Sequence, residues 1–202
     1  MRIAATAALL GALYAPASAQ GIEMLYEVRA QKPDAEWIQL IRNDAEKVPD
    51  RIQDALNRAG GRIVIFDGDM TDNPELKEYK GMKLPNTGLS YGIIDGKYLQ
   101  KKAFVRQRIE RYTGSISPVL HEIGHMVDDV FGYPSESESF RDAMKSAKGF
   151  YEGVKEPWQV WAEGFARYYY SPGSNADMKK KFPGLHSYFA DFELRAYVRV
   201  FP

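Results

Sequence analysis

Apolar residues recur at steps of three and four along two long segments of the chain, a spacing typical of amphipathic helices. The first segment begins at Ser117, a favourable N-cap, with Pro118 in the first helical position, and it ends before Gly132. The second follows Pro157 and extends to Tyr170. The sequence therefore predicts two helices, each with a buried stripe. The stripe of the first helix consists of Val119, Leu120, Ile123, Met126, Val127 and Val130.

The rest of the pattern predicts a small sheet between two groups of helices. Residues 20–32 and 67–91 are expected to be irregular, the latter as a long ordered loop. Helices, then strands, then helices indicate one α+β domain around a small sheet. Runs of β-branched and aromatic residues predict strands at Arg62–Phe66, Tyr91–Ile94 and Lys102–Ile109. Further helices are expected over residues 33–47, 49–59, 135–148 and, interrupted at Pro183-Gly184, towards the end.

The first 19 residues have the pattern of a signal peptide. Arg2 gives a positive start, Ile3–Leu13 is apolar, and Ala17-Ser18-Ala19 is a small-x-small cleavage site. The apolar run is too short to cross a membrane, and no later segment approaches the required length. We therefore expect a signal peptide at residues 1–19 and one exported domain over residues 20–202, secreted or periplasmic, with no transmembrane segment.

Charge and cysteine content narrow the possible functions. The chain has 27 basic and 27 acidic side chains, so its formal net charge is zero. This balance argues against a nucleic-acid-binding protein. The chain has no cysteine, which excludes disulfides and thiolate ligands. A zinc ion would have to be held by nitrogen and oxygen ligands.

The first predicted helix contains His121-Glu122-Ile123-Gly124-His125, which reads H-E-x-x-H. Residues four apart lie on the same face of a helix, so the two imidazoles can bind one Zn²⁺. The glutamate beside the first histidine can reach a water on the metal. The chain has only three histidines, and two of them are in this motif. The motif therefore predicts a metal centre, whereas His186 is expected to be structural.

A catalytic zinc site needs a third protein ligand, and the second predicted helix offers two polar candidates on one face, Gln159 and Glu163. An ionised carboxylate binds zinc far better than a neutral amide does. From chemistry alone, Glu163 is the expected third ligand.

Three segments resemble the catalytic domain of anthrax lethal factor and, more closely, the secreted Pro-Pro endopeptidases of the same group. The similarity extends over about residues 61–192. It implies a zincin-like metallopeptidase domain with a small mixed sheet, an active-site helix and C-terminal helices. The segments that carry it are His121–Asp129, Pro157–Tyr170 and Phe66–Gly81, the last with Thr71-Asp72 and Tyr79-Lys80-Gly81.

The chain departs from this family at one position. The family's second helix reads E-x-x-x-E, in which the first glutamate binds zinc and the second supports the first histidine. Here Gln159 occupies the first position and Glu163 the second. Three arrangements remain open: Gln159 binds zinc through its carbonyl oxygen, Glu163 replaces it as ligand, or the site holds no catalytic metal.

The resemblance implies a zinc-dependent endopeptidase in which metal-activated water hydrolyses a peptide bond. Glu122 would be the general base, and His121 and His125 would hold Zn²⁺. The family has a tyrosine before the second helix that stabilises the oxyanion. Tyr151 is the nearest tyrosine, one residue out of register. The expected partner is a peptide or protein substrate bound in extended form at a sheet edge.

The alternative is a catalytically impaired relative that binds a peptide or partner without cutting it. Gln159 is the residue that favours this interpretation, because an incomplete set of ligands reduces metal affinity.

Overall fold

A computed structural model of the chain describes residues 26–85, 88–109 and 114–199. Its centre is a four-stranded sheet in the order β1-β2-β4-β3. β1 pairs with β2 and β2 with β4 in parallel, whereas β3 pairs with β4 antiparallel. The mixed sheet and the α+β class that we expected are therefore confirmed. The strands are β1 (Tyr26–Val28), β2 (Arg62–Phe66), β3 (Gly96–Leu99) and β4 (Lys102–Arg106).

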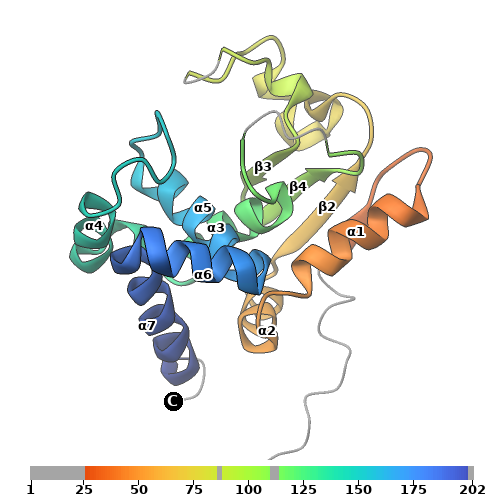
Figure 1. Cartoon of the computed structure of the whole chain (residues 1–202). Coiled ribbons are helices and arrows are strands. Elements are labelled where there is room, and N and C mark those ends of the chain that lie inside the picture. The colour runs from red at the N-terminus through yellow and green to blue at the C-terminus, as the bar shows by residue number, and fades with distance from the viewer. Residues whose placement is uncertain (1–25, 86–87, 110–113, 200–202) are drawn as a thin grey trace, which may run out of the picture.

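The two faces of the sheet have separate hydrophobic cores, because side chains alternate along a strand. Ile63 and Ile65 of β2 face the helices, whereas Val64 and Phe66 face the irregular segment between β2 and β3. The short 3-10 helices Met70–Asp72, Pro74–Tyr79 and Tyr91–Ile93 cover this second face. Figure 1 shows this segment as a separate layer above the strands.

The helical face is built around α3 (Pro118–Val130), against which α1 (Ala35–Ala45) and α2 (Asp50–Arg58) pack. Ser117 caps α3 by accepting a hydrogen bond from the backbone N–H of Leu120, as its sequence position predicted. Ser117 also donates to Asp44 of α1 at 2.6 Å. The start of α3 is therefore fixed against α1.

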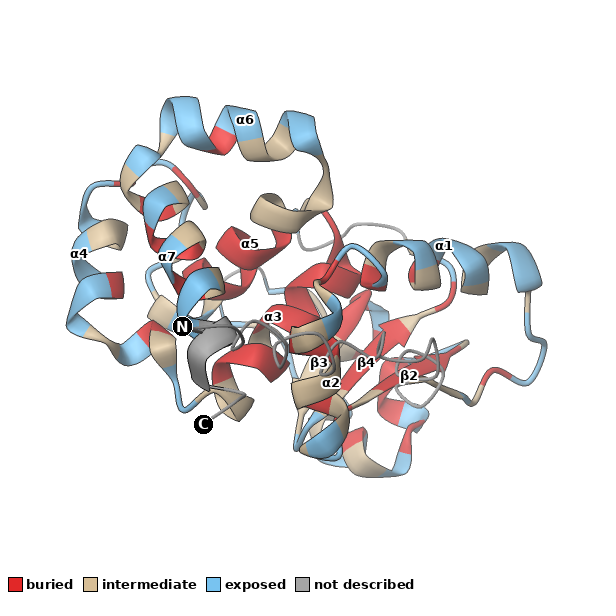
Figure 2. Ribbon diagram, turned by 90° about the horizontal axis from the view of Figure 1, so that it is seen from below, coloured by how far each residue is buried: buried red, intermediate tan, exposed pale blue. Residues whose placement is uncertain are grey.

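The second long helix, α5 (Pro157–Tyr170), lies against α3 and has the predicted bounds. Trp161 is completely buried and donates its indole N–H to the carbonyl oxygen of Gly124 at 3.1 Å. Figure 2 shows α3 and the middle of α5 as buried ribbon, whereas α1, α4 and α6 have long exposed faces. Three further helices pack against α5: α4 (Glu138–Lys145), α6 (Pro172–Lys181) and α7 (Pro183–Arg199).

Four expectations about the elements need correction. Tyr26–Val28, expected to be irregular, forms the short strand β1. Tyr91–Ile94, expected to be a strand, is a 3-10 turn, and the strand begins instead at Gly96. The strand expected to reach Ile109 ends at Arg106, and the helix expected over 135–148 is confined to α4.

The predicted signal peptide at residues 1–19 lies outside the described residues and stays a prediction. Within the described part, no helix combines the length and apolar character needed to cross a bilayer.

The close contact between α3 and α5 predicts that Gly124→Ala destabilises the protein. A Cβ at Gly124 would stand 2.9 Å from Cα and 3.1 Å from the carbonyl oxygen of Ala162, and backbone cannot move aside cheaply. The overpacking cost of about 1–3 kcal/mol exceeds the gain in helix propensity of about 1 kcal/mol. We expect a lower free energy of unfolding in urea, measured on metal-free protein.

Gly173→Ala is the matched control. Gly173 lies in α6, and the nearest atom to an added Cβ is 3.8 Å away. This substitution should leave the unfolding free energy unchanged or raise it by roughly 0.5 kcal/mol. Equal effects of the two substitutions would contradict tight packing at Gly124.

Candidate active site

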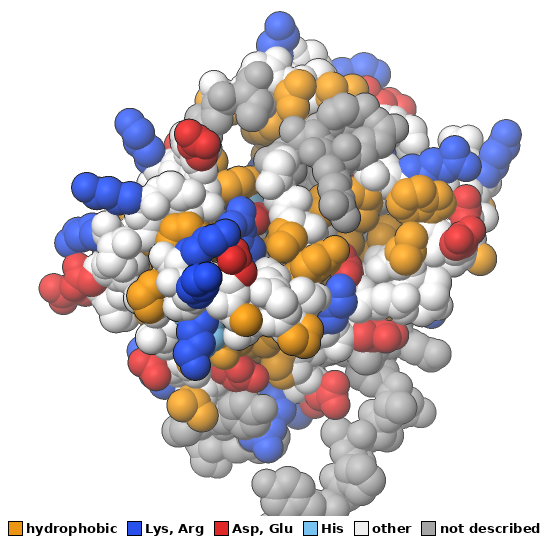
Figure 3. Space-filling view, in the orientation of Figure 1, with side chains coloured by type: hydrophobic (Ala, Val, Ile, Leu, Met, Phe, Trp, Pro, Cys, Tyr) orange, Lys and Arg blue, Asp and Glu red, His pale blue; other side chains and the backbone are white. Residues whose placement is uncertain are grey.

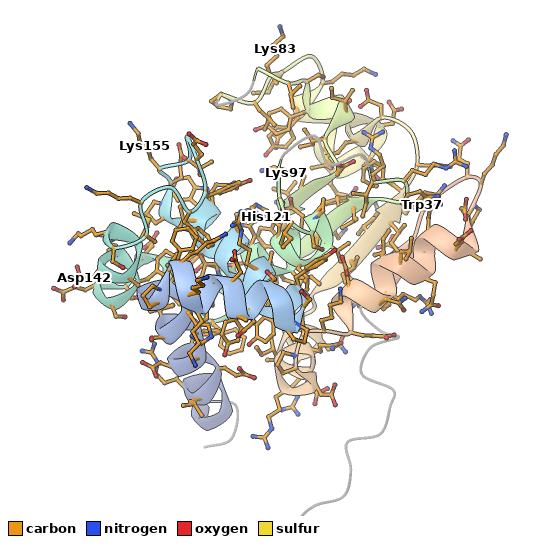
Figure 4. The ribbon with its side chains drawn as sticks, in the orientation of Figure 1. Trp37, Lys83, Lys97, His121, Asp142 and Lys155 are labelled. Carbon is orange, nitrogen blue, oxygen red and sulfur yellow. The ribbon has the colours of Figure 1, made fainter. Side chains whose placement is uncertain are left out.

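The two histidines of the H-E-x-x-H motif lie one above the other on α3. The ring centroids of His121 and His125 are 4.9 Å apart, with the ring planes at 82°. His121 is buried and His125 is partly buried. Figure 3 shows little histidine surface on this face, and Figure 4 places His121 in the interior. The helical spacing has therefore brought both imidazoles together away from bulk solvent.

Gln159 faces both histidines from α5. Its Oε1 lies 3.0 Å from Nε2 of His121, and its side chain also acts on the pKa of His125, which it raises. Gln159 is thus the polar group of α5 that faces the Nε2 side of the His121 ring. The amide group lies where the resemblance implies a ligand carboxylate.

Glu163 meets His121 from the other side of the ring. Its Oε2 is 3.4 Å from Nδ1 of His121, and its side chain is completely buried. Arg167, one turn further along α5, donates to the other carboxylate oxygen at 2.8 Å, and the N–H of Ile116 lies 3.3 Å from the same oxygen. Glu163 is therefore held as an ion, with His121 oriented against it.

The donor set fits a metal ion with nitrogen and oxygen ligands. Two ligands that are each about 2.0–2.1 Å from Zn²⁺ at tetrahedral angles lie about 3.3 Å apart. The Nε2–Oε1 distance between His121 and Gln159 is close to this spacing. Among the described residues no three side chains of the His, Cys, Asp and Glu types converge on one point, because the third neighbour is an amide. The side chains present therefore offer a metal ion two imidazoles and one neutral amide oxygen.

Glu122 points from α3 to the edge of the sheet. It is buried, and a Cβ on Gly96 of β3 would stand 2.6 Å from its Cγ. The backbone N–H of Tyr98 lies near its carboxylate. Burial raises the pKa of the Glu122 carboxyl, against the opposing charges of His121 and Lys97. This carboxylate is therefore at the free edge of β3, next to the histidines.

The environment gives the two imidazoles different proton affinities. Burial would lower the pKa of His121, but the hydrogen bond to Glu163 and the charge of Glu122 outweigh it and raise the pKa. Burial and the charge of His121 lower the pKa of His125 well below its usual value. Burial would raise the pKa of Glu163, but His121 and Arg167 outweigh it and lower the pKa.

Tyr151 lies close to the site, as the comparison of motifs suggested. Its ring is 6.1 Å from that of His121, in an edge orientation. Burial raises the pKa of the Tyr151 hydroxyl, and the charges of Glu163 and Glu122 add to the effect. The hydroxyl stays protonated at neutral pH, so it has a proton to donate. His186 lies elsewhere, where its Nε2 is 3.0 Å from Oδ1 of Asn175.

Sequence analysis missed three residues of the site. Tyr98 stacks on His125 with centroids 6.2 Å apart and donates its hydroxyl proton to Asp129. No sequence signal points to it, because the strand was expected elsewhere. Gly96 begins β3, and its lack of a side chain makes room for Glu122. Arg167 had a usable signal, since Glu163 and Arg167 are four residues apart on a helix.

Comparisons with known proteins agree with this geometry. A family model for anthrax toxin lethal factor, N- and C-terminal domain, matches residues 22–192. A Pro-Pro endopeptidase from Paenibacillus alvei is 30% identical over 157 residues, which cover 72% of each chain. The solved structure of the Pro-Pro endopeptidase PPEP-2 from the same organism superposes with a TM-score of 0.76 at 25% identity, covering 85% of this chain and 99% of that one.

The family match spans the sheet, the H-E-x-x-H helix and α5. The resemblance expected from the motifs is therefore confirmed, and the chain belongs to the anthrax toxin lethal factor family.

Proposed function

We propose that this protein is an exported, zinc-dependent endopeptidase. The observation that carries the proposal is that the H-E-x-x-H residues of α3 lie between a polar side chain of α5 and the edge strand of the sheet. His121 and His125 face Gln159 across the α3–α5 interface, and Glu122 lies beside the free edge of β3. The Pro-Pro endopeptidase relative supports a peptidase activity.

His121 and His125 would hold the metal, with Gln159 as the third protein ligand through its amide oxygen. When bound, the metal supplies Lewis-acid polarisation of the peptide carbonyl and lowers the pKa of water at the site. Glu163 would fix the ring of His121 from the Nδ1 side. The side of the His121 ring that each residue faces supports these two proposed roles.

Glu122 performs the proton transfers. Its carboxylate accepts a proton as water adds to the peptide carbonyl carbon, and it returns that proton to the nitrogen as the C–N bond breaks. Tyr151 donates a hydrogen bond to the negative charge that develops on the carbonyl oxygen. Water is consumed, and a new carboxyl and a new amino terminus are released.

The substrate would bind as an extended peptide that adds a strand to β3. Among the described strands, β3 is at the end of the sheet and pairs only with β4, so no described strand occupies its other side. The names of the relatives suggest a bond between two prolines as the substrate to test first.

One observation favours the alternative of a binding module without catalysis. Oε1 of Gln159 lies at hydrogen-bond distance from Nε2 of His121, 3.0 Å away. An amide has both donors and an acceptor, so it can act as the partner of an imidazole in the absence of a metal. Metal content separates the two functions: near-stoichiometric zinc in the purified protein supports the enzyme, and none after incubation with zinc at neutral pH supports the module.

Glu122→Gln should abolish most of the cleavage. The substitution removes the proton acceptor and keeps the side-chain shape, so kcat on a Pro–Pro peptide should fall by at least about 100-fold. Zinc content and the circular dichroism spectrum should stay unchanged. The exposed Glu36 is the matched control, and Glu36→Gln should cleave at the wild-type rate. Wild-type cleavage by the Glu122→Gln protein would refute the mechanism.

Gln159→Glu should strengthen zinc binding. A carboxylate adds a negative charge next to the metal and replaces a neutral oxygen, so the dissociation constant should fall by at least roughly tenfold. Competition with a chelating dye measures the constant, with Gln39→Glu on the exposed face of α1 as the matched control. Equal affinity in the wild type and the Gln159→Glu protein would show that position 159 does not contact the metal.

A further inference from the structure

Lys97 lies in β3, one residue from the glycine that makes room for Glu122. It pairs with Phe104 of β4, whereas Gly96 pairs with Val105. Phe104 belongs to the core under the 3-10 segment, and Val105 belongs to the helical core. Side chains alternate along a strand, so Lys97 projects from the sheet face opposite to α3.

The ammonium group of Lys97 is held against aromatic rings. Its Nζ is 5.5 Å from the ring centre of Tyr79 and 5.9 Å from that of Tyr91. The two tyrosines contact each other with centroids 4.8 Å apart. Lys97 is partly buried, and no ion pair joins it to a carboxylate of the described residues. Its position is therefore defined by cation–π contacts and not by an ion pair with a described residue.

The backbone of Lys97 adjoins the candidate active site, because it follows Gly96, where an added Cβ would stand 2.6 Å from Cγ of Glu122. The charge of Lys97 opposes the burial-driven rise in the pKa of Glu122 and adds to the fall in the pKa of His125. In the view of Figure 4, Lys97 is labelled between Lys83 and His121. A substrate strand on the free edge of β3 would pass this charge within a residue or two of the bond to be cut.

We propose that Lys97 is a specificity-determining residue that binds the carboxylate of an aspartate or glutamate side chain in the substrate. The proposal rests on the endopeptidase function proposed above. A peptide paired with the edge of β3 places alternate side chains on the face of Lys97, Tyr79 and Tyr91. Opposite charges on neighbouring strands attract, and like charges repel. At one substrate position close to the scissile bond, the protein therefore prefers an acidic residue and disfavours a basic one.

The test uses end-capped peptides with a Pro–Pro bond, so that side chains carry the only carboxylates. Each of the three residues on either side of the bond is in turn Glu, Gln or Lys. At one position the wild type should cleave the Glu peptide with a kcat/KM roughly tenfold above that of the Lys peptide. The ratio should shrink in concentrated salt, which screens the pair.

Four variants assign the effect to Lys97. Lys97→Gln should remove the preference, Lys97→Glu should reverse it, and Lys97→Arg should keep it. Lys148→Gln, which removes the same charge from an exposed lysine after α4, should leave the preference unchanged. A preference that survives Lys97→Gln would overturn the proposal, as would a wild type that cleaves the Glu and Lys peptides equally.

Binding measurements keep this proposal separate from the proposed function. Fluorescence anisotropy of the same peptides with the Glu122→Gln protein reports binding without turnover. If the Glu122→Gln protein binds the Glu peptide more tightly than the Lys peptide, and Lys97→Gln in the same protein removes this difference, the Lys97 site is supported. This result would hold even if the wild type cleaved no peptide and the endopeptidase proposal failed. Cleavage without any charge preference in rate or binding refutes the Lys97 site alone.

Discussion

The site depends on how closely α3 and α5 approach each other. Gly124 lets the backbone of α5 come within contact distance at Ala162, and the buried indole of Trp161 donates to the carbonyl oxygen of the same glycine. This contact fixes the rotation of α5 about its axis. Gln159 and Glu163 then meet His121 from two sides of one imidazole ring. A larger residue at position 124 would move both polar side chains away from the histidine.

The second constraint is the contact between α3 and the edge strand. Glu122 faces the backbone of β3 because position 96 has no side chain, and Tyr98 holds the next turn of α3 by stacking on His125 and bonding to Asp129. One helix therefore carries the histidines towards α5 and the glutamate towards the strand. The carboxylate of Glu122 lies beside the edge of the sheet because residues 96–99 both form the edge strand β3 and pack against α3.

Residues with strong local signals were predicted well. Pro118, Pro157 and their flanking residues set the starts of α3 and α5, and β2 was predicted with its observed bounds. β1 and β3 were not, because short strands of three and four residues form through pairing with neighbours far away in the sequence. Histidine spacing predicted that both imidazoles lie on one face of α3, as the structure shows. The sequence could not show which face of the His121 ring each residue of α5 meets, since that depends on the packing of two helices.

The neutral charge of the side chain at position 159 would affect both the affinity of the proposed metal site and the stability of the site without a metal. Glu122 and Glu163 are both buried next to His121, and their negative charges act on the same imidazole. A glutamate at position 159 would place a third carboxylate among two histidines, and buried like charges are costly unless a cation offsets them. Gln159 avoids this cost, because its amide is neutral and its Oε1 lies at hydrogen-bond distance from Nε2 of His121. In the proposed metal site, the same neutrality would remove one negative charge from the ligands, so we expect the chain to hold the metal less tightly and to tolerate its loss better.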